Sequence, residues 1–104
     1  NKIIGKITSG GESFGNVETN IVNDDLDKAG FNVGDSVTVT ITDDEKIYFD
    51  GPVAYEKSFG YVEIGASVLF KDLASFVSIG LNQRSFADTY GISADKVYTI
   101  VIQK

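Results

Sequence analysis

The sequence predicts a small all-β protein, a closed β-barrel carrying one or two short helical turns. Short β-branched and aromatic segments recur along the 104 residues, turn-forming residues separate them, and only two segments carry helix signals. A closed barrel is favoured over a β-sandwich because closure removes the edges that such apolar strands would otherwise expose. A chain of this length is expected to form one domain, residues 1–104.

The first half of the chain is predicted to hold four strands and one helical turn. The cleanest alternation is Ser36–Thr42, whose valines and isoleucine face the core while its threonines face solvent. Residues 23–30 read as a helical turn that Asn23 caps and Gly30 ends. The four strands are expected at 2–8, 17–22, 36–42 and 46–49.

The second half begins with a long connection. Gly51-Pro52 is expected to interrupt the strand before it, and residues 53–65 show no sustained period, so we predict a surface loop holding at most one short strand. A short helix is expected over 85–91, where Ser85 and Asp88 resemble a capping box and a glycine ends the helix. The remaining strands are expected at 67–71, 76–81 and 96–103.

Composition limits the chemistry. Histidine and cysteine are absent, so the chain has no imidazole base and no thiolate, and we expect neither a catalytic residue nor a metal site in it. The acidic tip Asp43-Asp44-Glu45 lacks the regular ligand spacing of a calcium loop. A formal charge of −6 disfavours nucleic acid as a partner. No apolar run is long enough for a membrane span and no leader-like segment is present, so we expect a cytoplasmic protein.

The run Phe14-Gly15-Asn16 precedes the second strand and is the most informative motif. Glycine permits a sharp turn, so the aromatic ring before it and the amide after it would both face one pocket. The alternative is a tight turn with a buried Phe14.

This motif and the segments that follow it resemble one family in order and spacing. They are 5–7, 12–16, 26–30, 34–37, 58–59, 64–65, 82–83, 86–87 and 90–92. Together they resemble the C-terminal domain of the S-adenosylmethionine (SAM) hydroxide adenosyltransferases, a family that includes the fluorinase- and chlorinase-type enzymes. In that family the domain is a small barrel that completes a site whose catalytic residues lie in an N-terminal α/β domain.

The resemblance implies a function. The family converts SAM and water to adenosine and methionine, and the nucleoside site lies where the N-terminal domain meets the barrel of a neighbouring subunit in a trimer. It therefore implies an adenosine-type ligand with no separate cofactor, an N-terminal catalytic domain as partner, and a homo-oligomer. This chain alone would contribute the adenine-binding half of the site and would not turn over substrate.

The resemblance also implies roles for particular residues. Asn16 would hydrogen-bond the adenine edge, Phe59 would stack on the adenine face, and the backbone at Gln83 would meet the other edge. Phe14 would line the same pocket. Glu12 stands where the family usually has Asp and would be either a ligand for an amino group or a solvated loop carboxylate.

Part of the pattern is missing. Leu73-Ala74-Ser75 replaces the family's polar turn that helps to hold the methionine end, and Arg84 replaces a glycine. These changes favour adenine recognition over amino-acid recognition. They also leave an alternative open, in which the chain is a degenerate, non-catalytic β-barrel module for interaction or oligomerisation.

Overall fold

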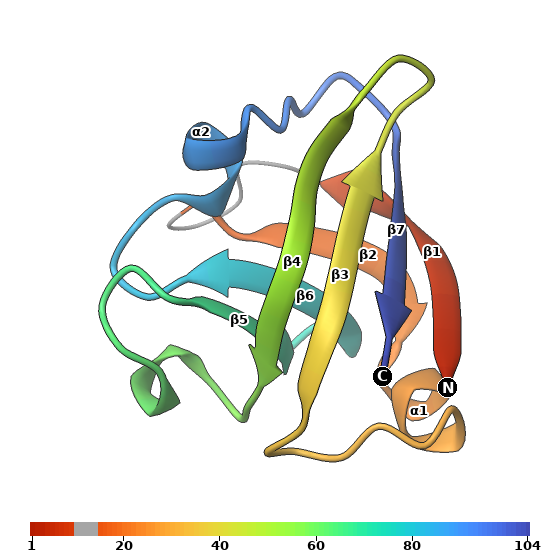
Figure 1. Cartoon of the computed structure of the whole chain (residues 1–104), viewed down its shortest axis with the longest axis vertical. Coiled ribbons are helices and arrows are strands. Elements are labelled where there is room, and N and C mark those ends of the chain that lie inside the picture. The colour runs from red at the N-terminus through yellow and green to blue at the C-terminus, as the bar shows by residue number, and fades with distance from the viewer. Residues whose placement is uncertain (10–14) are drawn as a thin grey trace.

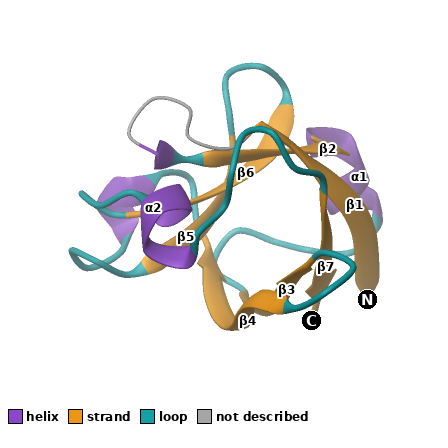
Figure 2. Cartoon of the chain, turned by 90° about the horizontal axis from the view of Figure 1, so that it is seen from above, coloured by secondary structure: helices purple, strands orange, loops and turns teal. Residues whose placement is uncertain are grey.

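The computed structural model describes residues 1–9 and 15–104, and within these ranges seven strands close into a barrel (Figures 1 and 2). The order around the barrel is β1-β2-β6-β5-β4-β3-β7. The strands are β1 (Lys2–Ser9), β2 (Val17–Val22), β3 (Ser36–Thr42), β4 (Ile47–Tyr55), β5 (Ser67–Lys71), β6 (Phe76–Leu81) and β7 (Tyr98–Gln103). The predicted fold class is therefore confirmed.

The two ends of the chain meet where the barrel closes. β7 pairs antiparallel with β1 on one side and with β3 on the other. Lys2 lies opposite Gln103, and the backbone N–H of Lys104 donates to the carbonyl of Asn1 at 3.0 Å, so both termini lie side by side (Figure 1). β4 and β5 are parallel, whereas the other neighbouring strands are antiparallel.

Alternating side chains fill the barrel. In β3, the valines and the isoleucine are buried and the residues between them are not, as the alternation predicts. The same period places every second residue of β7 and β6 inside. The largest fully buried side chains are those of Tyr55, Tyr98, Phe31, Phe86 and Leu26.

Short helices cover parts of the barrel. In α2 (Phe86–Tyr90), the Ser85 hydroxyl accepts a hydrogen bond from the backbone N–H of Asp88, and Gly91 ends the helix with a φ of 72°, which confirms the predicted caps. A 3₁₀ turn, η2 (Phe59–Tyr61), lies in the connection between β4 and β5. None of the helices in 1–9 or 15–104 combines the length and the apolarity that crossing a bilayer requires.

The predicted cap at Asn23 is wrong. Val22 occupies the cap position of α1 (Asn23–Lys28), and Asn23 is already its first helical residue. The backbone N–H of Asn23 donates to the carbonyl of Ser75 at 3.0 Å, so the chain enters the helix directly from β2 and leaves no separate capping residue. Asn23 Oδ1 is buried and accepts no hydrogen bond from residues 1–9 or 15–104.

The expected interruption at Gly51-Pro52 is also wrong, because β4 runs through it to Tyr55. Pro52 lies opposite Thr38 of β3, but β4 pairs with β5 only at Ala54 and Tyr55. At Pro52 the strand therefore has a partner on one side only, where a missing N–H is tolerated. β7 in turn begins at Tyr98, two residues later than expected, because residues 93–96 form a turn.

The β3–β4 hairpin is held together by Asp43. Its carboxylate accepts hydrogen bonds from the Tyr48 hydroxyl and from the backbone N–H groups of Glu45 and Lys46, the latter two at 2.8 and 2.9 Å. The Tyr48 hydroxyl, followed by the two backbone donors, lowers the pKa of Asp43 from 3.8 to about 2. The tip thus uses one of its acids as a structural acceptor.

Replacing Ile100 by Ala tests the core. Ile100 is fully buried, so we expect Ile100→Ala to lower the free energy of unfolding by about 2–5 kcal/mol in urea denaturation. Ile4 on neighbouring β1 is 61% exposed, so Ile4→Ala should change it by less than about 0.5 kcal/mol. Equal effects of the two changes would contradict the assigned core.

At low pH, the Asp43 carboxylate should no longer stabilise the fold. Because the pKa of the folded state lies below that of the unfolded chain, this carboxylate stabilises the fold above about pH 5 and loses that effect as the pH falls towards 2. The melting temperatures of wild type and Asp43→Asn should therefore differ at pH 6 and converge near pH 2. The control is Asp44→Asn at the exposed tip, which should leave the melting temperature nearly unchanged throughout.

Candidate functional site

Asn16 and Phe59, which are 43 positions apart in the sequence, meet over Gly80 of β6. A Cβ atom built on Gly80 would overlap Asn16 Oδ1 and would lie 2.8 Å from Phe59 Cε1 and 3.3 Å from Asn16 Cγ. The predicted amide and the predicted ring therefore contact the same point of the barrel wall. Their role in ligand binding remains a prediction.

The sheet register places Asn16 there. β2 and β6 run antiparallel with Val17 opposite Ile79 and Glu18 opposite Ser78. Continuing that register by one residue puts Asn16 opposite Gly80, so both lie on the same side of the sheet.

That side is the outer face of the barrel. Val77, Ile79 and Leu81 belong to the central core, so Ser78 and Gly80, which alternate with them, face away from it. On neighbouring β5 the outward residue Phe70 packs against Phe59, with ring centroids 4.8 Å apart. The Phe59 ring is thus supported on one side and remains partly exposed.

The segment after β6 fixes the turn that carries Phe59. The Asn82 side chain donates to the Val62 carbonyl at 2.8 Å, and the Gly65 N–H donates to the Asn82 carbonyl at 2.8 Å. Asn82 therefore ties the connection that holds η2 to the start of the α2 segment, and it keeps Phe59 beside that segment.

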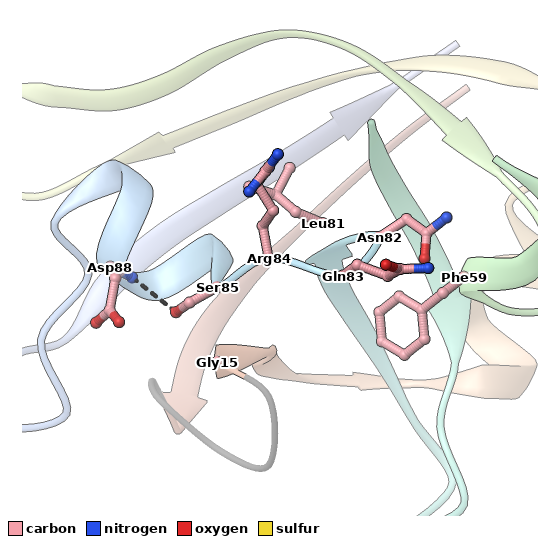
Figure 3. A pocket seen from close by; sticks show the side chains of 8 residues that line it. All are labelled: Gly15, Phe59, Leu81, Asn82, Gln83, Arg84, Ser85 and Asp88. Carbon is pink, nitrogen blue, oxygen red and sulfur yellow. Dashed lines mark hydrogen bonds between the residues drawn. The ribbon is translucent and has the colours of Figure 1, made fainter. Parts of the chain in front are cut away.

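A cavity of about 660 Å³ opens beside the ring (Figure 3). This volume lies within the 300–1,000 Å³ typical of small-ligand sites. Figure 3 shows Phe59, Asn82 and Gln83 towards one end and Ser85 and Asp88 towards the other. The lining residues are Gly15, Phe59, Leu81, Asn82, Gln83, Arg84, Ser85 and Asp88.

Gln83, the third predicted site residue, lines this cavity. Its φ of 58° is left-handed, and the N–H of Arg84 donates back to the carbonyl of Leu81 at 3.3 Å. The chain therefore turns sharply here, and the exposed backbone at Gln83 borders the same hollow as Phe59.

Gly15 joins the strand entrance to α2. Its φ is 75°, and a Cβ atom there would overlap the Ser85 side chain and approach Ser85 Cα to 2.8 Å. Any side chain at this position would push the 15–16 segment away from the helix cap.

A second cavity, of about 540 Å³, lies on the Asn16 side of the amide–ring contact. Asp72 at its wall accepts hydrogen bonds from the Ala74 and Phe76 N–H groups and from the Ser78 hydroxyl, at 2.7–3.0 Å. Burial raises the pKa of Asp72, but hydrogen bonds with Glu18, Ser78 and the backbone outweigh it, so the pKa lies below its ordinary value. Asp72 therefore serves mainly to hold the turn between β5 and β6.

Two of the exposed residues of that turn are apolar. Leu73 is fully exposed and Ala74 is exposed as well. Lys71 at the same wall is paired with Asp27 at 2.8 Å, and that carboxylate raises the pKa of Lys71. The second cavity therefore adds few uncommitted polar groups beyond Asn16 and Lys57.

The Asn16 amide oxygen has no hydrogen-bond partner among the described residues. Its Oδ1 atom is buried and accepts no hydrogen bond from any of them. Leaving such a group unpaired costs free energy, so this oxygen, on a residue that borders the second cavity, calls for an explanation.

The chemistry offered is recognition. Within the described ranges no three Asp or Glu side chains gather as they would around a metal ion. An amide, an aromatic ring and a stretch of backbone are suited to binding a flat heterocycle, whereas they provide no nucleophile paired with a base.

Sequence reasoning missed Gly80, Asn82 and the contact between Gly15 and Ser85. A glycine inside the strand 76–81 was a usable signal, because such a glycine often marks a close approach to a neighbouring group. Glu12 and Phe14, the other two predicted site residues, lie outside the described residues.

Comparison with known proteins identifies the family. The family model for the SAM hydroxide adenosyltransferase C-terminal domain matches residues 12–99. The chain belongs to this family as its C-terminal domain.

One relative and two solved structures are similar to most of this chain. A fluorinase from Nocardia brasiliensis is 31% identical over 93 residues, which cover 88% of this chain and 30% of the relative. An uncharacterized conserved protein from Thermotoga maritima superposes with a TM-score of 0.83 at 28% identity, covering 99% of this chain and 36% of that one. A conserved hypothetical protein from Thermus thermophilus shares the fold, with a TM-score of 0.58 at 18% identity over 93% of this chain and 34% of its own. The chain thus spans about a third of the length of these relatives.

Changing Gly15 tests the junction between the strand entrance and α2. Gly15→Ala combines an unfavourable left-handed φ with overlap at Ser85, so we expect a loss of about 1–3 kcal/mol in urea denaturation. Gly34 also has a positive φ, 99°, but has open space around it. Gly34→Ala therefore reports the backbone cost alone, and a loss in Gly15→Ala no larger than in this control would contradict the role of the Ser85 contact.

Proposed function

We propose that this chain contributes the adenine-binding half of a SAM-dependent site that an N-terminal catalytic domain completes. The observation that carries the proposal is the convergence of the Asn16 amide and the Phe59 ring over Gly80, where the ring borders the larger cavity and the amide borders the second one. Family membership supplies the chemical context. The chain on its own binds without catalysing.

Each group has a task that suits its chemistry. The Asn16 amide carries both a donor and an acceptor, as does the Watson–Crick edge of adenine. The Phe59 ring supplies a stacking surface worth roughly 1–3 kcal/mol. The backbone near Gln83 borders the same cavity as Phe59 and would meet another edge of the base.

The complete reaction would require the other domain. Water attacks the 5′ carbon of SAM, the bond from that carbon to sulfur breaks, and its electron pair stays on sulfur as methionine leaves. The attacking water loses a proton, and adenosine is the second product. In the proposed assembly, an N-terminal domain of another subunit in a homo-oligomer, in the cytoplasm, would position the water, while this barrel holds the base.

A non-catalytic interaction module is the second candidate. Three large apolar side chains near the site, those of Leu73, Tyr61 and Ile64, are 107%, 63% and 62% exposed. Such side chains are also suited to contacting another chain. In that case Asn16 would have no effect on nucleoside binding.

Nucleoside titration distinguishes the two functions. In an NMR titration of the chain with adenosine, we expect a dissociation constant of about 1 mM and no tighter, because the contacts of half a site offset little more than the entropy lost on association. Asn16→Ala and Phe59→Leu should each weaken binding about tenfold, and Tyr61→Ala, an exposed ring of the same turn, should not.

Two results would refute the proposal. No shift at 10 mM adenosine, about ten times the expected constant, would remove the nucleoside site and leave the interaction module. Micromolar affinity of the isolated chain would show that the site is already complete and that no second domain is needed.

A further inference from the structure

Gly80 is a buried glycine inside β6, one residue before the strand ends, and no turn requires a glycine at this position. It pairs with Val68 of β5 in regular register, and its φ is not positive. A glycine inside a strand weakens the strand, so its presence here needs another reason.

The reason lies on the outer face. The position that a side chain at Gly80 would occupy is taken by Asn16 Oδ1 and by the edge of the Phe59 ring. The hydrogen that stands in place of a Cβ therefore points at the amide oxygen and makes a weak C–H contact with it. The Asn16 amide and the Phe59 ring therefore both lie directly against the backbone of Gly80.

Each group is restrained on one side. Phe59 is backed by Phe70, and Asn16 is held by the register of β2 against β6. An added methyl group would therefore move the amide and the ring apart and would not be absorbed by a flexible surface chain.

We propose that Gly80 is the positioning residue of the adenine site, because its missing side chain lets Asn16 and Phe59 share one point of the barrel wall. This inference rests on the proposed function for its ligand readout. It names a residue that would not touch the nucleoside and yet would determine whether the two contacting groups are correctly spaced.

Other glycines of the same barrel provide matched controls. A Cβ at Gly5 on β1 would approach Ile21 Cγ1 to 2.6 Å, so Gly5→Ala brings a comparable overlap on a strand that β2 separates from β6. A Cβ at Gly51 on β4 would have its nearest neighbour at 4.0 Å, so Gly51→Ala adds a methyl group without overlap.

The first measurement needs no ligand. In NMR spectra of the free chain, Gly80→Ala should shift the Asn16 side-chain amide and Phe59 ring signals more than Gly51→Ala and Gly5→Ala do. Shifts at these two groups no larger than in the controls would overturn the inference.

The second measurement is adenosine affinity. Gly80→Ala should weaken binding at least tenfold, as loss of a stacking or hydrogen-bonding group does, whereas Gly5→Ala and Gly51→Ala should retain wild-type affinity. Adding Asn16→Ala to Gly80→Ala should cost no more than about a further twofold, because the amide is already displaced. Full affinity in Gly80→Ala, or independent losses in the double variant, would contradict the positioning role.

Thermal unfolding keeps the test decisive if the single variant folds poorly. Gly80→Ala should lower the melting temperature by roughly 5–15 °C. Asn16→Ala removes the overlapping atoms, so it should raise the melting temperature in the Gly80→Ala background more than in the Gly5→Ala background. An equal change in both backgrounds would overturn the inference.

The two proposals fail separately. If wild type binds no adenosine, the proposed function falls, while the NMR shifts and the thermal coupling still decide whether Gly80 sets the spacing. If wild type binds and Gly80→Ala binds equally well, the nucleoside site stands without Gly80 as its positioning residue.

Discussion

The antiparallel pairing of β2 with β6 is the constraint on which the site depends. Because side chains alternate along a strand, a slip of one residue would carry Asn16 to the other face of the sheet. The register is regular at Val17 and Glu18 and then shifts before Val22. The buried Thr19 hydroxyl lies at this irregularity, donating to the carbonyl of Val77 at 2.8 Å and accepting from the N–H of Ile21 at 3.0 Å. A single side chain thus satisfies backbone groups that a bulge would otherwise leave unpaired.

The sheet of the barrel separates two groups of side chains, the core inside it and a smaller cluster on its outer face. Inside, branched and aromatic side chains fill the volume and provide the stability of the fold. Outside β5 and β6, Phe70, Phe59 and Asn16 form a smaller cluster over a glycine. The core and this outer cluster share the same strands but use opposite faces of them.

Much of the fold follows from local patterns. β2, β3, β5 and β6 begin and end where alternation and turn residues predicted. Prediction from the sequence was wrong where tertiary pairing overrides a local signal. Pro52 is an example: the strand tolerates a proline there because it pairs with β3 on one side and has no partner on the other. The prediction at Asn23 was wrong for a related reason, because a backbone bond to Ser75 leads β2 straight into the helix.

The site was only partly accessible to sequence reasoning. Asn16, Phe59 and Gln83 came from a family resemblance, and the structure places all three beside the two cavities. Their spacing could not be predicted, because it depends on which strand lies beneath them. Only the three-dimensional register shows that the glycine of β6 is the residue between the amide and the ring.

The insertion of β7 between β1 and β3 has a consequence for how the domain matures in the cell. During synthesis β1 and β3 each present an unsatisfied edge until β7 emerges from the ribosome, because both are partners of Tyr98–Gln103. Closure joins residues about a hundred positions apart, a topology that folds slowly. Once β6 has joined the other strands, the domain is an open sheet with two unpaired edges, and it becomes a barrel only when β7 pairs with both of them.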